Sequence, residues 1–355
     1  MKIAFVYTGE EYLGIEYLSA VLKDNGHQTS LFYDPRLFND HYVSNQLLER
    51  VFNFQKKIIK QIIQLKPGLI AFSVNSPEYA WALSLAYSIK KAIDVPIVFG
   101  GHHPTCCPEE VISNNSVDFV IQGEGEYALL DLVRHLEGKV KKEEINNLFF
   151  RSNGKIHNIG LRSFIGNLDE LPFPDKELFY SEMPFLSQNY TIMVSRGCPY
   201  SCSYCHNNYL KKLYYGKGKY VRTRSIENVI KELKERKNIY NMKGVMFQDE
   251  IFTLDFDWLK EFSSRYKKEI GLPYACYVHP NTIDAKTADL LRSSGCVSVN
   301  IGIESIDEKV RRELLGRSIP QSQILNTLIL LGKKGIYFRA YFLIGLPGQK
   351  EEDLI

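Results

Sequence analysis

Three cysteines near the middle of the chain have the type and spacing of a metal-binding loop. Cys198, Cys202 and Cys205 stand at C-x3-C-x2-C, directly after the strand-like run Tyr190–Val194. Thiolates are the usual protein ligands of iron–sulfur clusters, and a cubane cluster with three protein ligands keeps one iron open for a small molecule. A structural zinc site normally has four ligands, and His206, the nearby fourth candidate, is awkwardly adjacent to Cys205. A zinc site completed by a distant residue and three unrelated buried thiols are the alternatives.

The segment that contains these cysteines alternates strand-like and helical stretches. Five such units predict an open or partial (β/α) barrel, in which functional groups sit at the carboxyl ends of the strands. The strand candidates are Thr191–Ser195, Gly244–Gln248, Tyr274–His279, Val297–Ile303 and Tyr337–Ile344, and the helical stretches between them are Ser225–Ile239, Asp257–Glu269, Asp284–Ser294 and Gln321–Lys334.

Polar residues follow two of these strands in register with the cysteine loop. Asp249 and Glu250 come after the second strand, where they could bind the ammonium group of a ligand. Glu304 and Ser305 come after the fourth strand, next to Gly302, and suit a ribose or an amino group. Each acidic residue taken alone could equally be a helix cap or a solvated loop residue. Their appearance after successive strands favours a binding site.

Several other residues keep two interpretations. His279 ends the third strand and is a candidate for facing a substrate. Arg339 lies inside a strand, where it could bind a carboxylate in the barrel or point to solvent. Cys276 and Cys296 are expected to be small core residues. Lys211–Arg224 is basic with interleaved tyrosines, and could be a substrate lid or a solvated loop.

The first part of the chain predicts a doubly wound, Rossmann-like parallel sheet. Ligands of such sheets bind beyond the carboxyl ends of the strands, and the lack of G-x-G-x-x-G after the first strand argues against a dinucleotide. The predicted strands are Lys2–Tyr7, Gln28–Tyr33, Leu69–Val74, Pro96–Phe99 and Val117–Ile121, and the predicted helices are Tyr12–Asn25, Gln46–Leu65, Tyr79–Ile93 and a helix that runs through Leu136.

The composition is that of a globular protein. With 355 residues, 45% of them apolar and 24% charged, the chain is long enough for two domains. A net charge of +3 does not by itself indicate nucleic-acid binding. The N-terminal apolar run is too short for a signal peptide, and no stretch reaches the ~20 apolar residues that span a bilayer. Seven cysteines, three of them clustered, do not suggest a disulfide framework, so we expect a reduced, cytoplasmic setting.

The cysteine loop, with its R-G-C-P lead-in and Tyr204 before the third cysteine, resembles the signature of the radical S-adenosylmethionine (radical SAM) superfamily. The resemblance implies a [4Fe–4S] cluster whose open iron is chelated by the amino and carboxylate groups of S-adenosylmethionine. One electron then cleaves that molecule to methionine and a 5′-deoxyadenosyl radical. It also implies a set of S-adenosylmethionine contacts: Tyr204, Asp249, Glu250, Gly302, Glu304 and Ser305.

The first domain looks like the cobalamin-binding domain of one large group of radical SAM proteins, through Gly100–Thr105 and Gly123–Glu126. The D-x-H-x-x-G loop of many cobalamin domains is missing, because Thr8–Gly14 contains no histidine. Cobalamin would then be held base-off without a protein histidine, or the domain is degenerate. The residues expected to contact cobalamin are Thr8, Gly9, Ser73, Asn75, Gly100, Gly101, His102, Gly123 and Glu124.

We expect a Rossmann-like domain over residues 1–140, a linker with a small hairpin over 141–189, and a partial barrel over 190–355. The family's barrel usually has a sixth strand, and a helix would begin at Glu351–Ile355, so we expect a truncated chain.

The resemblance implies a cobalamin-dependent enzyme that methylates an unactivated carbon. Oxidative cyclisation or rearrangement and a non-catalytic sensor are alternatives. Transfer-RNA methylthiolation would need more cluster cysteines than Cys106 and Cys107 supply. The expected partners are a small-molecule or natural-product-like substrate and a flavodoxin- or ferredoxin-type electron donor, without nucleic acid or a membrane span.

Overall fold

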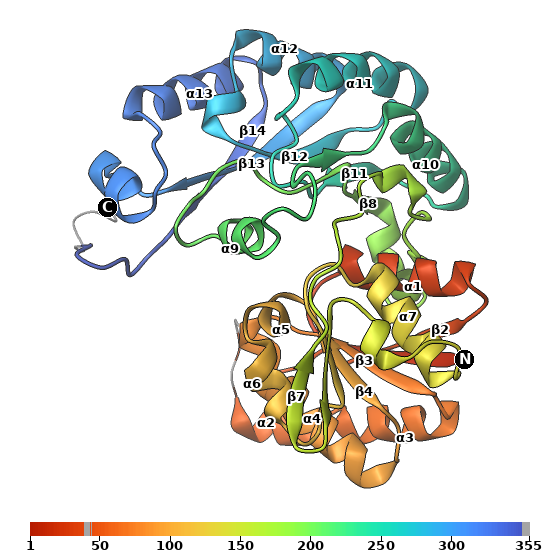
Figure 1. Ribbon diagram of the computed structural model, residues 1–355. Coiled ribbons are helices and arrows are strands. Elements are labelled where there is room, and N and C mark those ends of the chain that lie inside the picture. Colours follow the sequence, from red (N-terminus) through yellow and green to blue (C-terminus); the bar gives the residue numbers. More distant parts are fainter. Residues whose placement is uncertain (39–42, 44, 350–355) are drawn as a thin grey trace. The chain divides into compact units, whose positions relative to one another are not determined.

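The computed structural model describes residues 1–38, 43 and 45–349 and forms two compact units, which are coloured along the chain in Figure 1. The first unit comprises Met1–Ile165 and Leu171–Met183, and the second comprises Gly166–Glu170 and Pro184–Ile355. Most of the expected linker therefore belongs to the first unit. The helix start expected at Glu351–Ile355 lies outside the described residues.

The first unit is built on one sheet with the order β2-β1-β3-β4-β5-β6-β7. The strands from β2 to β5 are parallel, as expected, and their order has the switch point between β1 and β3 that is typical of doubly wound sheets. The hairpin expected in the linker instead extends this sheet as two antiparallel strands. The strands are β1 (Lys2–Tyr7), β2 (Gln28–Tyr33), β3 (Leu69–Ser73), β4 (Ile97–Gly100), β5 (Phe119–Ile121), β6 (Leu148–Ser152) and β7 (Lys155–Asn158).

The long helix expected at Gln46–Leu65 is two helices, so that prediction was wrong. The side chain of Asn53 accepts a hydrogen bond from the Gln55 N–H (2.9 Å), which starts a new helix after the first has ended. Ile58 and Ile62 of the second helix are buried in the core of the sheet. The helices are α1 (Leu13–Asp24), α2 (Gln46–Val51), α3 (Gln55–Leu65), α4 (Tyr79–Ala92), α5 (His102–Cys106), α6 (Pro108–Ser113), α7 (Glu126–Leu136) and α8 (Glu177–Tyr180).

Buried charges fasten the segment Leu171–Met183 to the first unit. Lys176 Nζ lies 2.8 Å from Glu11 Oε1 and 2.7 Å from Glu16 Oε2, and all three side chains are nearly or fully buried. Next to them, Asp175 accepts a hydrogen bond from the Ser19 hydroxyl. An isolated buried ammonium would be very costly, so Lys176 depends on these carboxylates. The part of the expected linker from Leu171 to Met183 is thus an integral part of the first unit.

The second unit is an open parallel sheet with the order β14-β13-β12-β11-β8. Neighbours in the sheet follow one another along the chain, as in a partial (β/α) barrel, and Figure 1 shows the long helices along one side of it. A short antiparallel pair, β9–β10, holds the start of the cysteine loop. The strands are β8 (Asn189–Ile192), β9 (Ser195–Arg196), β10 (Arg222–Thr223), β11 (Gly244–Phe247), β12 (Tyr274–Val278), β13 (Cys296–Glu304) and β14 (Tyr337–Phe342), and the helices are α9 (His206–Leu213), α10 (Ile226–Ile239), α11 (Phe256–Glu269), α12 (Ala285–Ser294) and α13 (Gln321–Lys333).

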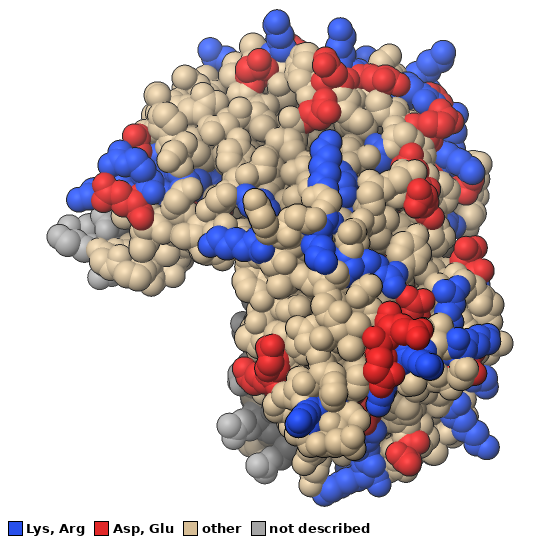
Figure 2. Space-filling model, in the orientation of Figure 1, with Lys and Arg blue, Asp and Glu red and all other residues tan. Residues whose placement is uncertain are grey.

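The outer helices of this sheet carry interspersed charges of both signs, as Figure 2 shows on the face drawn there. Arg265 of α11, for example, pairs with Glu269 on its own helix and with Glu227 on α10. Within the described ranges, no helix is both long and apolar enough to cross a membrane.

A buried ion pair joins the first strand of the second unit to its helix α10. Arg224 Nη2 donates to Glu232 Oε2 (2.5 Å), and the Tyr190 hydroxyl donates to Glu232 Oε1 (2.7 Å). Arg224 also donates to the carbonyl of Met193, directly after β8 (3.2 Å). Because both carboxylate oxygens are bonded, the charge of Glu232 is compensated inside the core. This cluster fixes the end of β8, from which the cysteine loop departs.

We predict that Glu232→Ala lowers the free energy of unfolding by about 3–5 kcal/mol, because it leaves the buried Arg224 without its carboxylate. Glu235→Ala, at an exposed position of the same helix, should change it by less than about 0.5 kcal/mol. Urea denaturation of both variants measures the difference. Equal effects of the two substitutions would show that the pair does not stabilise the fold.

Candidate functional site

The cysteine loop leaves the carboxyl end of β8 and runs into α9. Cys198 and Cys205 are half-buried and Cys202 is buried, and all are free thiols. The Cys205 N–H donates to the Cys202 carbonyl (3.2 Å), and α9 begins directly after Cys205. Burial raises the pKa of the Cys198 thiol. A metal that binds there must therefore displace its proton.

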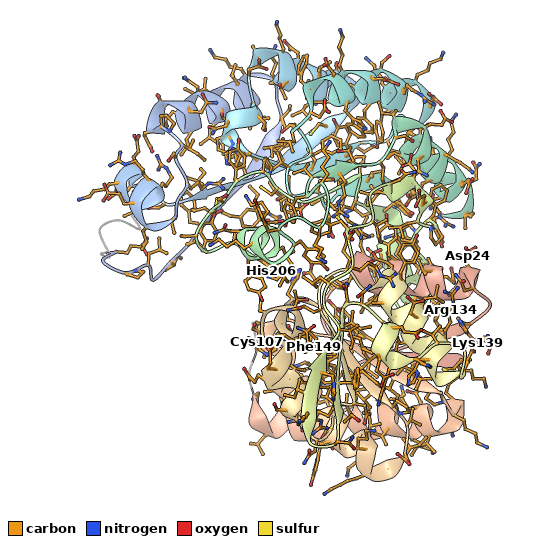
Figure 3. All side chains as sticks on the ribbon, in the orientation of Figure 1. Asp24, Cys107, Arg134, Lys139, Phe149 and His206 are labelled. Carbon is orange, nitrogen blue, oxygen red and sulfur yellow. The ribbon has the colours of Figure 1, made fainter. Side chains whose placement is uncertain are left out.

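The other residues considered as ligands are His206, Cys106 and Cys107. Figure 3 labels His206 at the start of α9 and Cys107 in the first unit. Cys107 and its neighbour Cys106 stand at the junction of α5 and α6 and belong to the first unit. His206, by contrast, directly follows Cys205 in the chain.

A glycine allows the loop to pass close to another segment. Gly197 has φ +93°, and a Cβ added there would lie 2.5 Å from the Tyr220 carbonyl oxygen. Its N–H donates to Glu250 Oε1 (3.2 Å). Glu250, expected to bind a ligand ammonium, thus contacts the backbone directly before Cys198. A side chain at position 197 would push the first cysteine away from the segment that precedes β10.

Lys211 of α9 holds the centre of the loop. Its Nζ donates to the carbonyls of Pro199 (3.0 Å) and Tyr200 (2.5 Å) and to the hydroxyl of Ser201 (2.7 Å). These are the three residues between Cys198 and Cys202. The segment Lys211–Arg224, expected as a lid or a solvated loop, therefore begins with a residue that positions the loop. The basic run gave no sign of this contact in the sequence.

Arg317 is a second cation at the loop, and sequence reasoning missed it. Its Nη1 donates to Cys202 Sγ (3.8 Å), and its Nη2 donates to the Gly302 carbonyl (2.6 Å). The side chain is buried, and its Nε has no hydrogen-bond partner among the described residues. The guanidinium thus places a positive charge next to the sulfur of Cys202. Because Arg317 stands 115 positions after Cys202, no local pattern announces the contact.

Asp249 supports the entry to the loop. Its Oδ1 accepts hydrogen bonds from the N–H groups of Val194 (3.0 Å) and Ser195 (2.5 Å) and from the Ser195 hydroxyl (2.6 Å). Burial raises the pKa of Asp249 to about 7. Its Oδ2 is buried and has no partner within the described part of the chain. Only Oδ2 therefore remains for the ligand contact expected of Asp249.

The structure brings Tyr204, Gly302 and Glu304 together at the end of β13. The Tyr204 hydroxyl donates to the Glu304 carboxylate, and burial raises the pKa of Glu304. Glu304 has φ +69°, and its carboxylate folds back over Gly302, where a Cβ would collide with it. Ser305 instead accepts from the Asp307 N–H (3.2 Å) in a turn. Tyr204, Gly302 and Glu304 therefore form a group at the loop, whereas the Ser305 hydroxyl stabilises the chain.

The donor set of the loop is three thiols with a nearby guanidinium. Within residues 1–38, 43 and 45–349, no group of three or more His, Cys, Asp and Glu side chains is placed to hold one metal ion. In a cubane cluster each thiolate binds a different iron, so the sulfur atoms stay further apart. The donor set of three thiols with a guanidinium at Cys202 suits such a cluster, whose properties depend on hydrogen bonds to its sulfurs.

In the first unit, glycines mark the carboxyl ends of three strands. Gly9, Gly101 and Gly123 have φ values of +107°, +98° and +80° after β1, β4 and β5. Thr105 joins two of these loops, because its hydroxyl donates to the Gly101 carbonyl (2.7 Å) and accepts from the Gly123 N–H (3.0 Å). A Cβ on Gly101 would lie 2.7 Å from the backbone nitrogen of Val74. The backbone of these loops is closely packed at Gly101, and glycine lets a large flat ligand such as a corrin approach the backbone.

The residues expected to bind cobalamin divide into two groups. Glu124 belongs to the packing of the unit, because its carboxylate accepts from the Ile165 N–H (2.9 Å) and its carbonyl accepts from the side chain of Asn147 (2.8 Å). The others stand at the carboxyl ends of β1, β3, β4 and β5: Thr8, Gly9, Ser73, Asn75, Gly100, Gly101, His102 and Gly123.

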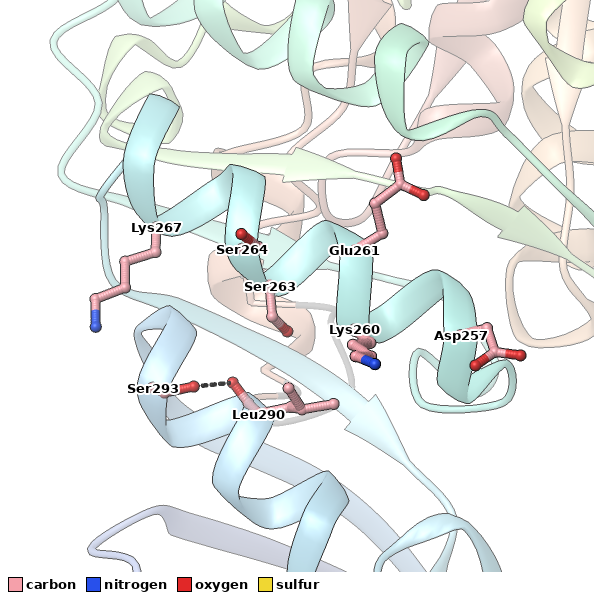
Figure 4. A pocket seen from close by; sticks show the side chains of 8 residues that line it. All are labelled: Asp257, Lys260, Glu261, Ser263, Ser264, Lys267, Leu290 and Ser293. Carbon is pink, nitrogen blue, oxygen red and sulfur yellow. Dashed lines mark hydrogen bonds between the residues drawn. The ribbon is translucent and has the colours of Figure 1, made fainter.

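A surface hollow between α11 and α12 is not part of this site. Figure 4 shows its lining on the outer helices, and none of its residues lies at the carboxyl end of a strand. It is lined by Asp257, Lys260, Glu261, Ser263, Ser264, Lys267, Leu290 and Ser293.

The fold and the two sites define an α/β protein that pairs a doubly wound ligand-binding unit with a partial barrel carrying a three-thiol loop. The family model of the radical SAM superfamily matches residues 192–355, and that of the B12 binding domain matches residues 4–133. The chain therefore carries a B12 binding domain followed by a radical SAM domain. These domains imply a [4Fe–4S] cluster, S-adenosylmethionine and cobalamin as cofactors.

Similar proteins include two methyltransferases and a cyclase. An uncharacterized methyltransferase of Pyrococcus horikoshii is 28% identical over 96% of this chain and 71% of its own length. The cytidylyl-2-hydroxyethylphosphonate methyltransferase of Streptomyces wedmorensis is 24% identical over 94% and 69%. The anaerobic magnesium-protoporphyrin IX monomethyl ester cyclase of Rubrivivax gelatinosus is 23% identical over 100% and 64%.

Two solved structures share the fold of the whole chain. The cobalamin-dependent S-adenosylmethionine radical enzyme OxsB with aqua-cobalamin matches at a TM-score of 0.77 and 19% identity, over 97% of this chain and 49% of that one. The radical S-adenosylmethionine methyltransferase TsrM of Kitasatospora setae matches at 0.75 and 17%, over 99% and 68%. The chain thus spans about half the length of the first structure and about two thirds of the second.

We predict that Gly101→Ala weakens the binding of hydroxocobalamin by about tenfold or more. The added Cβ strains a positive φ, at about 1–3 kcal/mol, and collides with the backbone at Val74. Gly138→Ala is the matched control, because it also has a positive φ but nothing within 4 Å of its Cβ. Absorption titrations of both variants measure the affinity, and equal affinities would contradict the assignment of this edge.

We predict that Lys211→Met accelerates the loss of the reconstituted cluster to a chelator by about tenfold, because the loop loses three hydrogen bonds. Lys212→Met, at the exposed neighbouring position, should behave like the unchanged protein. The decay of the iron–sulfur absorption under anaerobic conditions gives both rates. Indistinguishable decay of the two variants would mean that Lys211 does not position the loop.

Proposed function

We propose that the protein is a cobalamin-dependent radical SAM methyltransferase that methylates an unactivated carbon of a small-molecule or natural-product-like substrate. The observation that carries the proposal is the loop of Cys198, Cys202 and Cys205 at the carboxyl end of β8, braced by Lys211 and Arg317. The B12 binding domain in the same chain supports methyl transfer, as do the methyltransferases among its relatives.

When bound, the cluster supplies the electron that cleaves S-adenosylmethionine, and cobalamin supplies a carrier for the methyl group. The residues of this chain would hold the charged ends of S-adenosylmethionine. The Nε of Arg317 would donate to its carboxylate, because that nitrogen is buried and has no partner among the described residues. The carboxylates of Glu304, Glu250 and Asp249 would accept from its ammonium group.

The neighbouring side chains would also stabilise the charge of the site. Lys211 and Arg317 place two cations at a loop whose thiolates and sulfides are negative, which favours the assembled cluster. The Tyr204 hydroxyl donates to the carboxylate of Glu304 and so fixes the orientation of that carboxylate. The protein's contribution is thus to orient its ligands and to compensate charge where water is excluded.

Oxidative cyclisation is the second candidate, since a cyclase is among the relatives that match the whole chain. A non-catalytic sensor would use the same two sites without cleaving S-adenosylmethionine. We also propose a cytoplasmic setting and a flavodoxin- or ferredoxin-type electron donor. A reducing compartment suits free cysteines in the described part of the chain and an oxygen-sensitive cluster.

The test is an anaerobic assay of the reconstituted protein with S-adenosylmethionine, hydroxocobalamin and dithionite. We expect 5′-deoxyadenosine and methionine from the unchanged protein and from Cys106→Ala, and neither product from Cys202→Ala. With S-adenosylmethionine labelled in its methyl group, label on the bound cobalamin would support methyl transfer over cyclisation. A folded protein that holds a cluster but forms no 5′-deoxyadenosine would contradict the enzymatic proposal and favour a sensor.

A further inference from the structure

We propose that His279 is a positioning residue of the cysteine loop, which it supports through Tyr200, and that its Nε2–H donates to an acceptor atom held at that loop. The acceptor is a sulfur of the cluster or an oxygen of S-adenosylmethionine. The inference rests on the proposed function, because it requires the cluster that the loop would bind.

A direct stack joins the end of β12 to the centre of the loop. The rings of His279 and Tyr200 lie 4.0 Å apart between centroids, with an interplanar angle of 14°. Tyr200 stands midway between Cys198 and Cys202, and His279 is only 4% exposed. Because both rings are planar and close, movement of Tyr200 toward β12 is blocked. The stack therefore limits where the two neighbouring thiols can lie.

The backbone behind His279 is fixed by α13. The next residue, Pro280, has a carbonyl that accepts from Gln323 Nε2 (2.7 Å) and from the Thr327 hydroxyl (3.2 Å). The hydroxyl of Thr282 donates back to the His279 carbonyl (2.8 Å). These bonds prevent the end of β12 from shifting. His279 can thus act as a rigid support and not as a mobile loop residue.

The hydrogen bonds of the imidazole determine which nitrogen carries the proton. Nδ1 of His279 accepts from the Asn281 N–H (3.2 Å), so Nδ1 is unprotonated. The neutral ring then carries its proton on Nε2. Burial, with the nearby charge of Arg317, lowers the pKa of His279 to about 3, which keeps the ring neutral. His279 therefore offers one fixed donor near the guanidinium that reaches Cys202.

That donor has no acceptor in the described residues, although it is buried. A buried, unsatisfied N–H costs free energy, and buried polar groups in proteins almost always have partners. The bond of Nδ1 to the Asn281 N–H explains an imidazole at this position but leaves its Nε2–H unsatisfied. An acceptor from a bound ligand would satisfy that N–H, and the cluster loop is the ligand site that His279 contacts through Tyr200.

The test compares His279→Phe with Tyr266→Phe. Both remove a buried polar atom that lacks a partner among the described residues, but Tyr266 lies on α11, within the apolar core of the unit. We expect both variants to bind iron like the unchanged protein. Redox titration followed by electron paramagnetic resonance measures the midpoint potential of the cluster, and equilibrium dialysis measures the affinity for S-adenosylmethionine.

A lower midpoint potential of His279→Phe without S-adenosylmethionine would identify a cluster sulfur as the acceptor, because hydrogen bonds to these sulfurs set the potential. An unchanged potential with about tenfold weaker binding would identify an oxygen of S-adenosylmethionine. If both quantities match those of Tyr266→Phe and the unchanged protein, His279 is a packing residue and the inference is wrong.

A second variant decides the matter if His279→Phe does not fold. His279→Gln keeps a side-chain donor without the ring, so near-normal affinity and potential would support the proposal. A changed midpoint potential together with weakened binding of S-adenosylmethionine, at normal iron content, would overturn it. The proposed function depends on the cluster of the unchanged protein, whereas this inference depends on the differences between variants, so the two can fail separately.

Discussion

The second unit depends on one constraint: a short loop must hold three thiols toward one ligand, although it contains too few residues to fix its own shape. The restraints come from elsewhere in the chain. Lys211 bonds the residues between the first two cysteines, Asp249 bonds the backbone before the loop, and Arg317 reaches Cys202. The partial barrel brings these residues together because the ends of its parallel strands share one edge.

In the first unit, glycines and one threonine hold the loops at the carboxyl ends of the strands. Its glycines at positive φ and the bonds of Thr105 bring the loops after β4 and β5 close together. The same unit includes the segment around Lys176, whose ammonium is compensated by two buried carboxylates. The edge that would receive cobalamin is thus built on a scaffold that extends beyond the Rossmann-like order of strands.

The strands, the cysteine loop and the glycine loops could be predicted from the sequence because their signals are local. Apolar runs mark the strands, and the spacing of Cys198, Cys202 and Cys205 is contained in eight residues. The contacts of Lys211 and Arg317 could not be predicted, since they join a loop to distant segments and follow no periodicity. The break before Asn53 was missed because the apolar pattern continues through it. Glu124 and Ser305 matched family motifs, yet their side chains stabilise local structure.

The central claim is that the loop binds a [4Fe–4S] cluster with one iron open to S-adenosylmethionine. Mössbauer spectroscopy of anaerobically reconstituted, isotope-enriched protein, with and without S-adenosylmethionine, tests it most directly. The account predicts the spectrum of a cubane cluster. Added S-adenosylmethionine should change the signal of one iron and leave the signals of the three thiolate-bound irons unchanged. A cluster whose irons all stay unchanged by S-adenosylmethionine, or a folded protein that assembles no cubane cluster, would contradict it.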